Sequence, residues 1–336
     1  MGNGPGALSL RKICENLRPI NLRGNMSKLA FIFPGQGAQY VGMGKDLYDN
    51  HPMAKETYEK ANEALKFDIT KICFESTPAE LRMTHNAQPA ILIHSIAAFR
   101  LMEKEGIKFD YTAGHSLGEY SALVAAGAVA FEDAVRLVRI RGSLMAISGD
   151  IQPGTMAAII GLEPREVENI CHQAREAGIV EAANFNSAEQ TVISGEVRAI
   201  EKAMELAKAK GAKRAVQLEV SGAFHSELMD IAQYGMRRAL NQITIKEPAC
   251  PVIANVSAEP VHSPATIKEL LIEQVKKPVR WEESVKKMAE LGVTTMIECG
   301  PGRVLKGLIK RIAPEVNVLN VEDSKTLAET MEALKK

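Results

Sequence analysis

The sequence predicts a mixed α/β fold in which a small subdomain is inserted into a larger core. Strand-like and helix-like stretches alternate along most of the chain, which is typical of helices packed on a mostly parallel sheet. Between residues 150 and 221 the order changes to β-α-β-β-α-β, the ferredoxin-like motif. We therefore assign residues 26–149 and 222–336 to the core and residues 150–221 to the small subdomain.

Runs of apolar residues, and the residues that end them, place the elements of the core. The first strand, LAFIF (29–33), stops at Pro34-Gly35, and a helix over 88–104 ends near Gly106. Further strands are expected at 111–113, 252–257 and 294–299. Further helices are expected at 46–65, directly after residue 118, and at 136–147, 267–275 and 304–312.

The small subdomain is expected to contain four strands and two helices. Pro164 favours the first turn of a helix over 163–176, and Gly211 ends a second helix over 197–210. The strands are expected at 154–162, 181–187, 190–196 and 214–220. Because ligand sites often lie at domain interfaces, the cleft between this subdomain and the core is the predicted functional site.

The composition is that of an ordinary globular protein. Of 336 residues, 46% are hydrophobic and 24% are charged, and 41 basic residues balance 41 acidic ones. A nucleic-acid or membrane-surface protein would carry a basic excess, so we expect neither partner. The longest apolar run, residues 122–131, is far shorter than the roughly 20 residues of a membrane-spanning helix. Five cysteines share no metal-ligand spacing, which predicts reduced thiols in the cytoplasm and no metal site.

Residues 1–25 differ from the rest of the chain. They hold four basic residues against one acidic residue, contain no apolar stretch long enough for a secretory signal, and precede a second methionine, Met26. We interpret them as a leader or upstream extension that is disordered, with a transit-type peptide as the alternative. They take no part in the predicted fold.

GHSLG, residues 114–118, fits the G-x-S-x-G pattern. A predicted strand precedes it and a helix follows, which is the context of the nucleophile elbow in an α/β-hydrolase-like core. Flanking glycines allow a strained turn, and free amides at the helix N-terminus can stabilise an oxyanion beside the Ser116 hydroxyl. A helix-capping serine between packing glycines is the alternative.

A serine hydroxyl needs a base before it can act as a nucleophile, and His225 is the candidate. This histidine follows a strand and precedes a helix, so it lies at the carboxyl edge of a strand, where open α/β folds place their sites. His94 lies on an apolar helix and is expected in the core, and His115 is expected to point elsewhere. A helix-capping or buried role for His225 is the alternative.

Six motifs along the chain resemble those of one enzyme family. They are FIFPGQGAQYVGMGKDLY, GHSLGEYSALVAAGA, the pair Arg141-Gly142, NFNS, GAFHSELM and ECGPG. Together they look like the motifs of malonyl-CoA:acyl carrier protein transacylases. The resemblance runs in order from about residue 29 to about residue 333, which is nearly all of the chain after the leader.

The resemblance implies roles for five residues around the reacting atoms. Ser116 would be the nucleophile that carries the acyl group, and His225 would be its general base. The family orients this imidazole with a main-chain carbonyl in place of a carboxylate, and that carbonyl maps to Gln274. The main-chain amides of Gln36 and Leu117 would form the oxyanion hole.

The resemblance also implies the residues that select the substrate. Arg141 would bind the carboxylate of a malonyl group through two parallel hydrogen bonds, with a solvated helix arginine as the alternative. Phe224 would favour malonyl over methylmalonyl by crowding an α-methyl group. Asn184 and Asn186 would line the cleft. Ala223 stands where the family more usually has proline, which leaves the other assignments unchanged.

By this resemblance the protein would transfer a malonyl group from malonyl-CoA to the phosphopantetheine thiol of acyl carrier protein, through a malonyl-serine intermediate, for fatty-acid biosynthesis. We expect a monomeric acyltransferase with no permanently bound cofactor. Because acyl carrier proteins are acidic, two basic groups are candidate docking sites. They are Lys306, Lys310 and Arg311, and Lys213 with Arg214.

Three other interpretations fit parts of the sequence. A serine hydrolase would need an acidic residue between nucleophile and histidine, and Asp133 and Asp150 in that interval lack the expected strand-end context. A non-catalytic subunit that only binds carrier protein would not need Ser116 and His225. An acyltransferase domain of a larger synthase is the third, and the compact length favours a free-standing enzyme over it.

Overall fold

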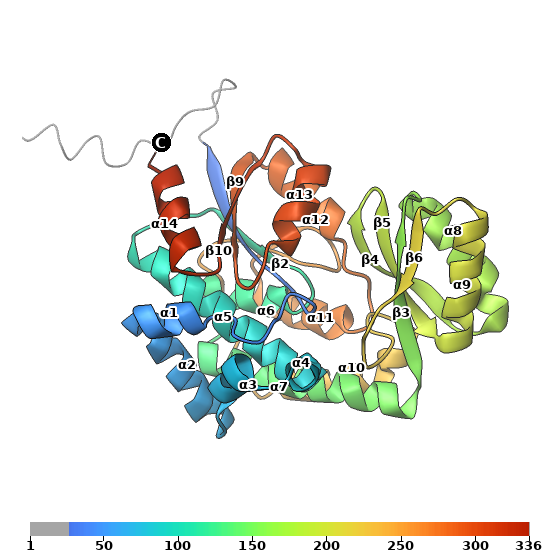
Figure 1. Cartoon of the computed structure of the whole chain (residues 1–336), viewed down its shortest axis with the longest axis horizontal. Coiled ribbons are helices and arrows are strands. Elements are labelled where there is room, and N and C mark those ends of the chain that lie inside the picture. Colours follow the sequence, from blue (N-terminus) through green and yellow to red (C-terminus); the bar gives the residue numbers. More distant parts are fainter. Residues whose placement is uncertain (1–26, 336) are drawn as a thin grey trace, which may run out of the picture.

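The computed structural model describes residues 27–335, so the leader predicted for residues 1–25 lies outside the described part of the chain. Within these residues the chain forms two separate sheets, one mostly parallel and one antiparallel, which lie side by side (Figure 1). The predicted mixed α/β fold is confirmed. No helix in the described range is long and apolar enough to cross a membrane.

The larger sheet has six strands in the order β10-β9-β1-β2-β7-β8. Neighbouring strands are parallel, except that β7 and β8 are antiparallel. The strands are β1 (Lys28–Phe33), β2 (Tyr111–Gly114), β7 (Val252–Ile253), β8 (Pro260–Val261), β9 (Val293–Cys299) and β10 (Asn317–Val321). Phe33 pairs with Gly114, so the loops that follow β1 and β2 begin at the same sheet edge.

Strand β1 shows why this sheet carries helices on both faces. Its residues alternate between two hydrophobic clusters, because successive side chains of a strand point to opposite faces. Phe31 and Phe33 pack in the cluster that includes helix α5, and Ala30 and Ile32 pack in the cluster that includes Trp281. A strand buried on both sides reads as a continuous apolar run, which is what the sequence shows.

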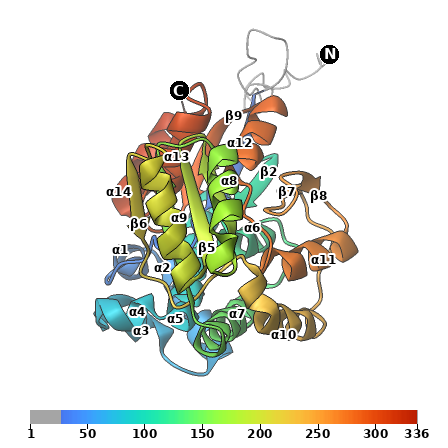
Figure 2. The same cartoon turned by 90° about the vertical axis from the view of Figure 1, so that its right-hand side faces the viewer.

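The smaller sheet has four antiparallel strands in the order β4-β5-β3-β6. They are β3 (Gly154–Ile160), β4 (Val180–Ser187), β5 (Gln190–Glu196) and β6 (Arg214–Gln217), and with helices α8 (Pro164–Ala174) and α9 (Val197–Ala209) they complete the predicted ferredoxin-like motif. Both helices cover one face of this sheet (Figure 2). The other face presents Met156, Ala158 and Val192 to a cleft.

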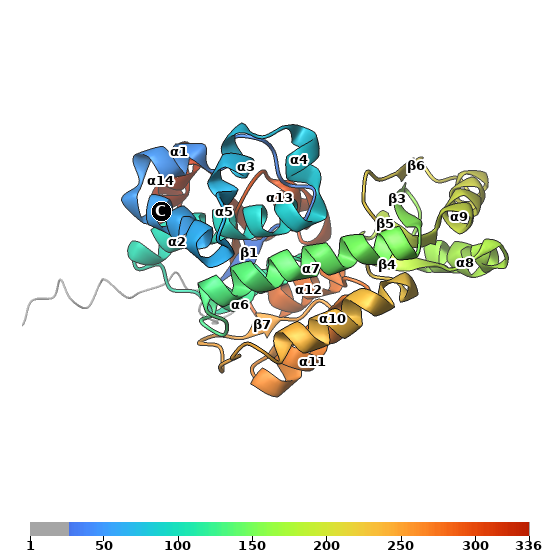
Figure 3. The ribbon, with the colours of Figure 1, turned by 90° about the horizontal axis from the view of Figure 1, so that it is seen from below.

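The remaining helices surround the larger sheet. They are α1 (Lys45–Asn50), α2 (Pro52–Leu65), α3 (Ile69–Glu75), α4 (Pro78–Arg82), α5 (Thr84–Lys104), α6 (Gly118–Ala125), α7 (Phe131–Ile151), α10 (Asp230–Leu240), α11 (Pro264–Gln274), α12 (Trp281–Glu290), α13 (Val304–Ile312) and α14 (Ser324–Ala333). Two short 3₁₀ turns lie at Arg175–Ala177 and Glu227–Met229. Helix α7 runs along the molecule from the larger part of the fold to the smaller sheet (Figure 3).

Two sequence predictions about the core are wrong in detail. The stretch 46–65 forms two helices instead of one, because Pro52 forces His51 into an extended conformation that ends α1. The stretch 252–257 is a strand only at Val252–Ile253. Asn255 leaves the sheet there and its side chain bonds the elbow, which the β-type composition of the segment does not reveal.

Candidate active site

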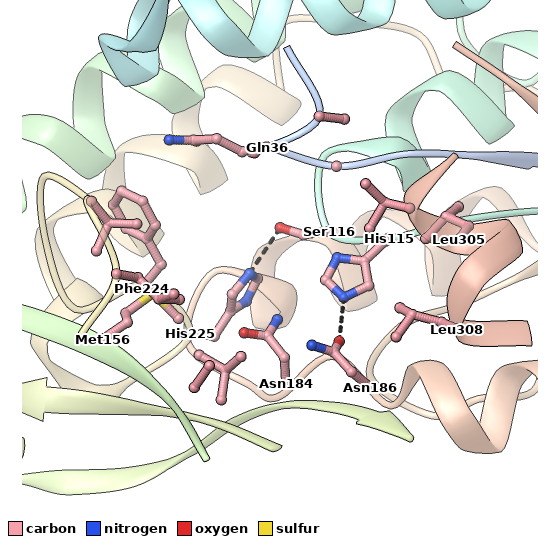
Figure 4. A pocket seen from close by; sticks show the side chains of 18 of the residues that line it. Gln36, His115, Ser116, Met156, Asn184, Asn186, Phe224, His225, Leu305 and Leu308 are labelled. Atoms are coloured by element: carbon pink, nitrogen blue, oxygen red, sulfur yellow. Dashed lines mark hydrogen bonds between the residues drawn. The ribbon is translucent and has the colours of Figure 1, made fainter. Parts of the chain in front are cut away.

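A cleft of about 800 Å³ lies between the two sheets. Its walls come from the loop after β1, from the residues after β2, from the bare face of the smaller sheet and from helix α13. Ser116 and His225 face each other in it, with Gln36 on one side and Asn184 on the other (Figure 4). The location agrees with the cleft expected from the sequence.

Ser116 occupies a strained corner between β2 and α6. Its φ angle of 51° lies in the left-handed region, which L-residues rarely adopt. The neighbouring glycines permit this turn: a Cβ on Gly114 would lie 2.0 Å from the main chain of Gly118, and one on Gly118 would lie 2.1 Å from the carbonyl oxygen of Phe33. The elbow therefore depends on close backbone approach at both glycines.

His225 lies within hydrogen-bond distance of the serine. Its Nε2 is 2.8 Å from the Oγ of Ser116, and its own φ of 59° is also left-handed. On the other side of the ring, Nδ1 is 2.7 Å from the main-chain oxygen of Gln274 and 3.2 Å from that of Lys277. Because carbonyl oxygens only accept, Nδ1 carries the proton and Nε2 is left as the acceptor for the serine proton.

The electrostatics keep this imidazole neutral. Burial, and then the positive charge of Arg141, lower the pKa of His225 to about 3, although the bond to Gln274 opposes the shift. The ring is therefore a base ready to accept a proton at any pH near neutrality. Within residues 27–335 no carboxylate bonds the ring. Asp133 bonds Arg136 and Asp150 is exposed, so neither completes a triad.

Arg141 is the buried cation of the site. The side chain is 1% exposed, and its Nη2 donates to the Ser116 Oγ at 3.1 Å and to the Gln274 Oε1 at 3.0 Å. Its Nη1 donates to Gln88 at 2.9 Å, and Nε has no partner within the described residues. The guanidinium also lies over the ring of Tyr120. This arginine thus faces the cleft and is not a solvated helix residue.

Two main-chain amides border the serine. Leu117 directly follows Ser116 at the start of α6. Gln36 lies in the loop after β1, and its side chain donates a hydrogen bond to Thr84. Within residues 27–335 neither main-chain amide has an acceptor. Unpaired amides beside a hydroxyl are the donors that an oxyanion requires.

The other predicted site residues also lie in the cleft. Phe224 is 6% exposed beside His225, and Asn184 and Asn186 project from β4 (Figure 4). Asn186 bonds the Nε2 of His115 at 2.8 Å. His115 therefore turns away from the serine hydroxyl, as expected, but it forms part of the cleft wall, which the sequence did not indicate.

The sequence did not predict a buried polar network behind Ser116. The Asn255 side chain accepts a hydrogen bond from the Ser116 main-chain amide at 2.6 Å and donates one to the Gly114 carbonyl at 2.6 Å. The side-chain amide of Gln274 donates to the Ser116 carbonyl at 2.9 Å and to Glu119 Oε2 at 2.7 Å. Burial raises the pKa of Glu119 to about 7, against the opposing effect of these hydrogen bonds and of Arg141. This network fixes the main chain of the elbow at Gly114 and Ser116 through hydrogen bonds.

Sequence comparison agrees with this geometry. Residues 30–330 match the model of the acyl transferase domain. The chain belongs to the acyl transferase family. The acyltransferase is 48% identical to the malonyl CoA-acyl carrier protein transacylase of Bacillus subtilis (strain 168) over 311 residues, which are 92% of this chain and 98% of that protein.

Solved structures similar to this acyltransferase share its fold. The acyl-carrier-protein-S-malonyltransferase of Bartonella henselae is 43% identical with a TM-score of 0.89, over 92% of this chain and all of that one. A malonyl-transacylase solved in complex with its type II polyketide synthase acyl carrier protein is 40% identical with a TM-score of 0.89, over 91% of this chain and all of that one.

Proposed function

We propose that this acyltransferase moves a malonyl group from malonyl-CoA to the phosphopantetheine thiol of acyl carrier protein, for fatty-acid biosynthesis. The single observation that carries the proposal is the contact of Ser116 Oγ with both His225 Nε2 and Arg141 Nη2. One oxygen thus has a base to take its proton and a cation to hold an anionic acyl group. The proposed chemistry uses no bound cofactor, and this expectation, the cytoplasmic location and the monomeric state stay predictions.

The first half-reaction forms a malonyl-serine ester. The Ser116 Oγ attacks the thioester carbonyl while its proton passes to Nε2 of His225. The carbonyl oxygen becomes an oxyanion, which accepts hydrogen bonds from the main-chain amides of Gln36 and Leu117. The carbon–sulfur bond then breaks, and the imidazolium returns the proton to the coenzyme A sulfur. Arg141 stays charged throughout.

The second half-reaction reverses these steps with another thiol. The phosphopantetheine sulfur loses its proton to Nε2 and attacks the ester carbonyl. The ester bond to Ser116 breaks, and the proton returns from His225 to Oγ. Because both thiols use the same cleft in turn, the mechanism is ping-pong, and coenzyme A leaves before carrier protein reacts.

The position of Arg141 supports malonyl as the acyl group. In an ester on Ser116 the malonyl carboxylate lies only two carbons beyond the carbonyl, so the cation that binds it must lie next to Oγ. Arg141 does, at 3.1 Å, and its Nε, which has no partner within the described residues, is a further buried donor for a carboxylate oxygen. An acetyl group would leave the guanidinium without this partner. Phe224 lines the same cleft and would crowd an α-methyl group there.

Helix α13 is the proposed docking face for carrier protein. It carries Lys306, Lys310 and Arg311, and Arg303 precedes it. Of these four cations, Arg303 and Arg311 line the cleft. Burial, then the charges of Lys310 and Arg303, lower the pKa of Lys306, so these cations form one cluster. The other candidate is weaker, because Lys213 already pairs with Glu189 at 3.2 Å.

A transfer assay tests the proposal. The wild-type protein and the Ser116→Ala and Arg141→Ala variants are mixed with malonyl-CoA and phosphopantetheinylated acyl carrier protein, and the malonylated carrier is measured by mass spectrometry. Of these three proteins, we expect only the wild type to transfer malonyl to the carrier at an appreciable rate. A wild-type protein that releases free malonate without loading the carrier would instead be a hydrolase, and the proposal would be wrong.

A further inference from the structure

A second buried charge, Glu119, lies beneath the site and takes no part in the proposed proton transfers. It stands in the first turn of α6, three residues after Ser116, and is 3% exposed. Its Oε2 accepts hydrogen bonds from the Gln274 Nε2 at 2.7 Å and from the Asn255 main-chain amide at 3.1 Å. Both donors converge on the same carboxylate oxygen.

One amide group joins this carboxylate to the guanidinium of Arg141. Gln274 donates to Glu119 through Nε2 and accepts from Arg141 Nη2 through Oε1, at 3.0 Å. Within the described residues no carboxylate lies at ion-pair distance from Arg141, and Glu119 is the acidic side chain whose charge acts on it. One side-chain amide therefore bridges the two buried charges.

We propose that Glu119 is the counter-ion of Arg141 and that its negative charge limits how strongly the guanidinium holds the carboxylate of a malonyl group. This inference rests on the malonyl transfer proposed above. Glu119 is a specificity-determining residue that acts through Arg141, and it does not touch the acyl group.

The physical reason is competition between two anions for one cation. In the empty site Glu119 offsets the buried charge of Arg141, which would otherwise be uncompensated. When a malonyl group arrives, its carboxylate gains the attraction of Arg141 but also the repulsion of Glu119. Removing the charge of Glu119 therefore strengthens the binding of the malonyl group. The binding of a neutral acetyl group does not change, because acetyl carries no charge for Glu119 to repel. A merely structural residue would weaken both reactions alike.

The variant Glu119→Gln separates charge from hydrogen bonding. The amide oxygen of the introduced side chain can take the place of Oε2, where both donors already converge, so the contacts to Asn255 and Gln274 persist. Glu298→Gln is the matched control. Glu298 is fully buried, accepts two main-chain amides from Leu305 and Lys306, and has its pKa raised to about 7 by burial, yet it has no contact with Arg141.

The measurement is kcat/KM for malonyl-CoA divided by kcat/KM for acetyl-CoA, at about pH 8. We expect this ratio to rise about tenfold in Glu119→Gln. This is the size of effect expected when the repulsion between two charges on either side of an amide is removed at the effective dielectric constant of a protein. It should stay unchanged in Glu298→Gln. A ratio that stays constant or falls in Glu119→Gln overturns the inference.

A second measurement needs no variant. Between about pH 6 and 8.5, Glu119 is the group of this cluster that changes charge: the pKa of His225 is about 3, burial lowers that of His115 below its usual value, that of Tyr120 is about 12, and Arg141 stays cationic. The wild-type ratio should fall several-fold as pH rises, and a flat ratio contradicts the inference. A wild-type protein that does not load malonyl at all refutes the proposed function instead.

Discussion

The guanidinium of Arg141 lies 3.1 Å from the hydroxyl of Ser116, the same oxygen that lies 2.8 Å from the imidazole of His225. The proposed base and the proposed carboxylate-binding group therefore meet at one atom. This contact limits the acyl chain. A carboxylate close to the ester carbonyl reaches Arg141, and a longer diacid would have to fold back on itself.

Replacing Arg141 by alanine should remove this recognition. We expect kcat/KM for malonyl-CoA to fall at least about 100-fold, because two charge-assisted hydrogen bonds are lost at about 1.5–3 kcal/mol each. Acetyl loading should be kept or increased. Arg141→Lys should recover little, because a point charge lacks the planar fork. Equal losses for the two acyl groups, measured by stopped-flow acylation, would mean that Arg141 does not bind the carboxylate.

The pH dependence of acylation should reflect the lowered pKa of His225. The free enzyme needs the neutral imidazole, and its pKa of about 3 means that kcat/KM for acetyl-CoA, whose neutral acyl group does not sense the charge of Glu119, stays level from about pH 8 to pH 5 and falls only at more acidic pH. In Arg141→Ala one cause of the lowering is gone, so the acid limb should move to higher pH. A wild-type profile with a midpoint near 6.5 would contradict this environment for the histidine.

The elbow should not tolerate a side chain at Gly118. Its Cβ would lie 2.1 Å from the Phe33 carbonyl, so Gly118→Ala should lower the free energy of unfolding by about 3 kcal/mol or more. Gly307→Ala on α13 is the control, because nothing lies within 4 Å of its Cβ and alanine favours a helix. Urea unfolding measures both. Similar stabilities for the two variants would show that the elbow relaxes easily.

The docking face should respond to charge reversal. Lys310→Glu should lower kcat/KM for acyl carrier protein several-fold at low salt and leave the first half-reaction with malonyl-CoA unchanged. Lys213→Glu, which disrupts an existing ion pair with Glu189, is the matched comparison. A transfer rate that depends on Lys213 but not on Lys310, or that is insensitive to salt, would move the docking site away from α13.

Local sequence patterns predicted the parts of the site that depend on local geometry. The elbow needed only a strand, two glycines and a helix around Ser116, and the ferredoxin-like motif needed only the order of its elements. Likewise, His94 is fully buried and bonds the Glu322 carbonyl, which confirms its predicted place in the core. His225 and Arg141 were ranked above other histidines and arginines through the family motifs, since position alone left alternatives open.

The network behind the serine could not be predicted in this way. Gln88, Glu119, Asn255 and the side chain of Gln274 come from four separate elements and meet only in the folded chain. Each has an ordinary local explanation: an acidic residue in the first turn of a helix, for example, usually needs no more than the helix dipole. Only the packing of α5, α6, α11 and the segment after β7 around one corner brings them together.

The most direct test of the account is the mass of the intact protein after brief mixing with malonyl-CoA and acid quenching, followed by peptide mapping. We predict one malonyl group per chain, attached at Ser116, that disappears when phosphopantetheinylated carrier protein is added before the quench. Ser116→Ala should gain no mass. Malonyl that remains on Ser116→Ala, or a wild-type chain that turns over without ever carrying malonyl, would contradict the mechanism.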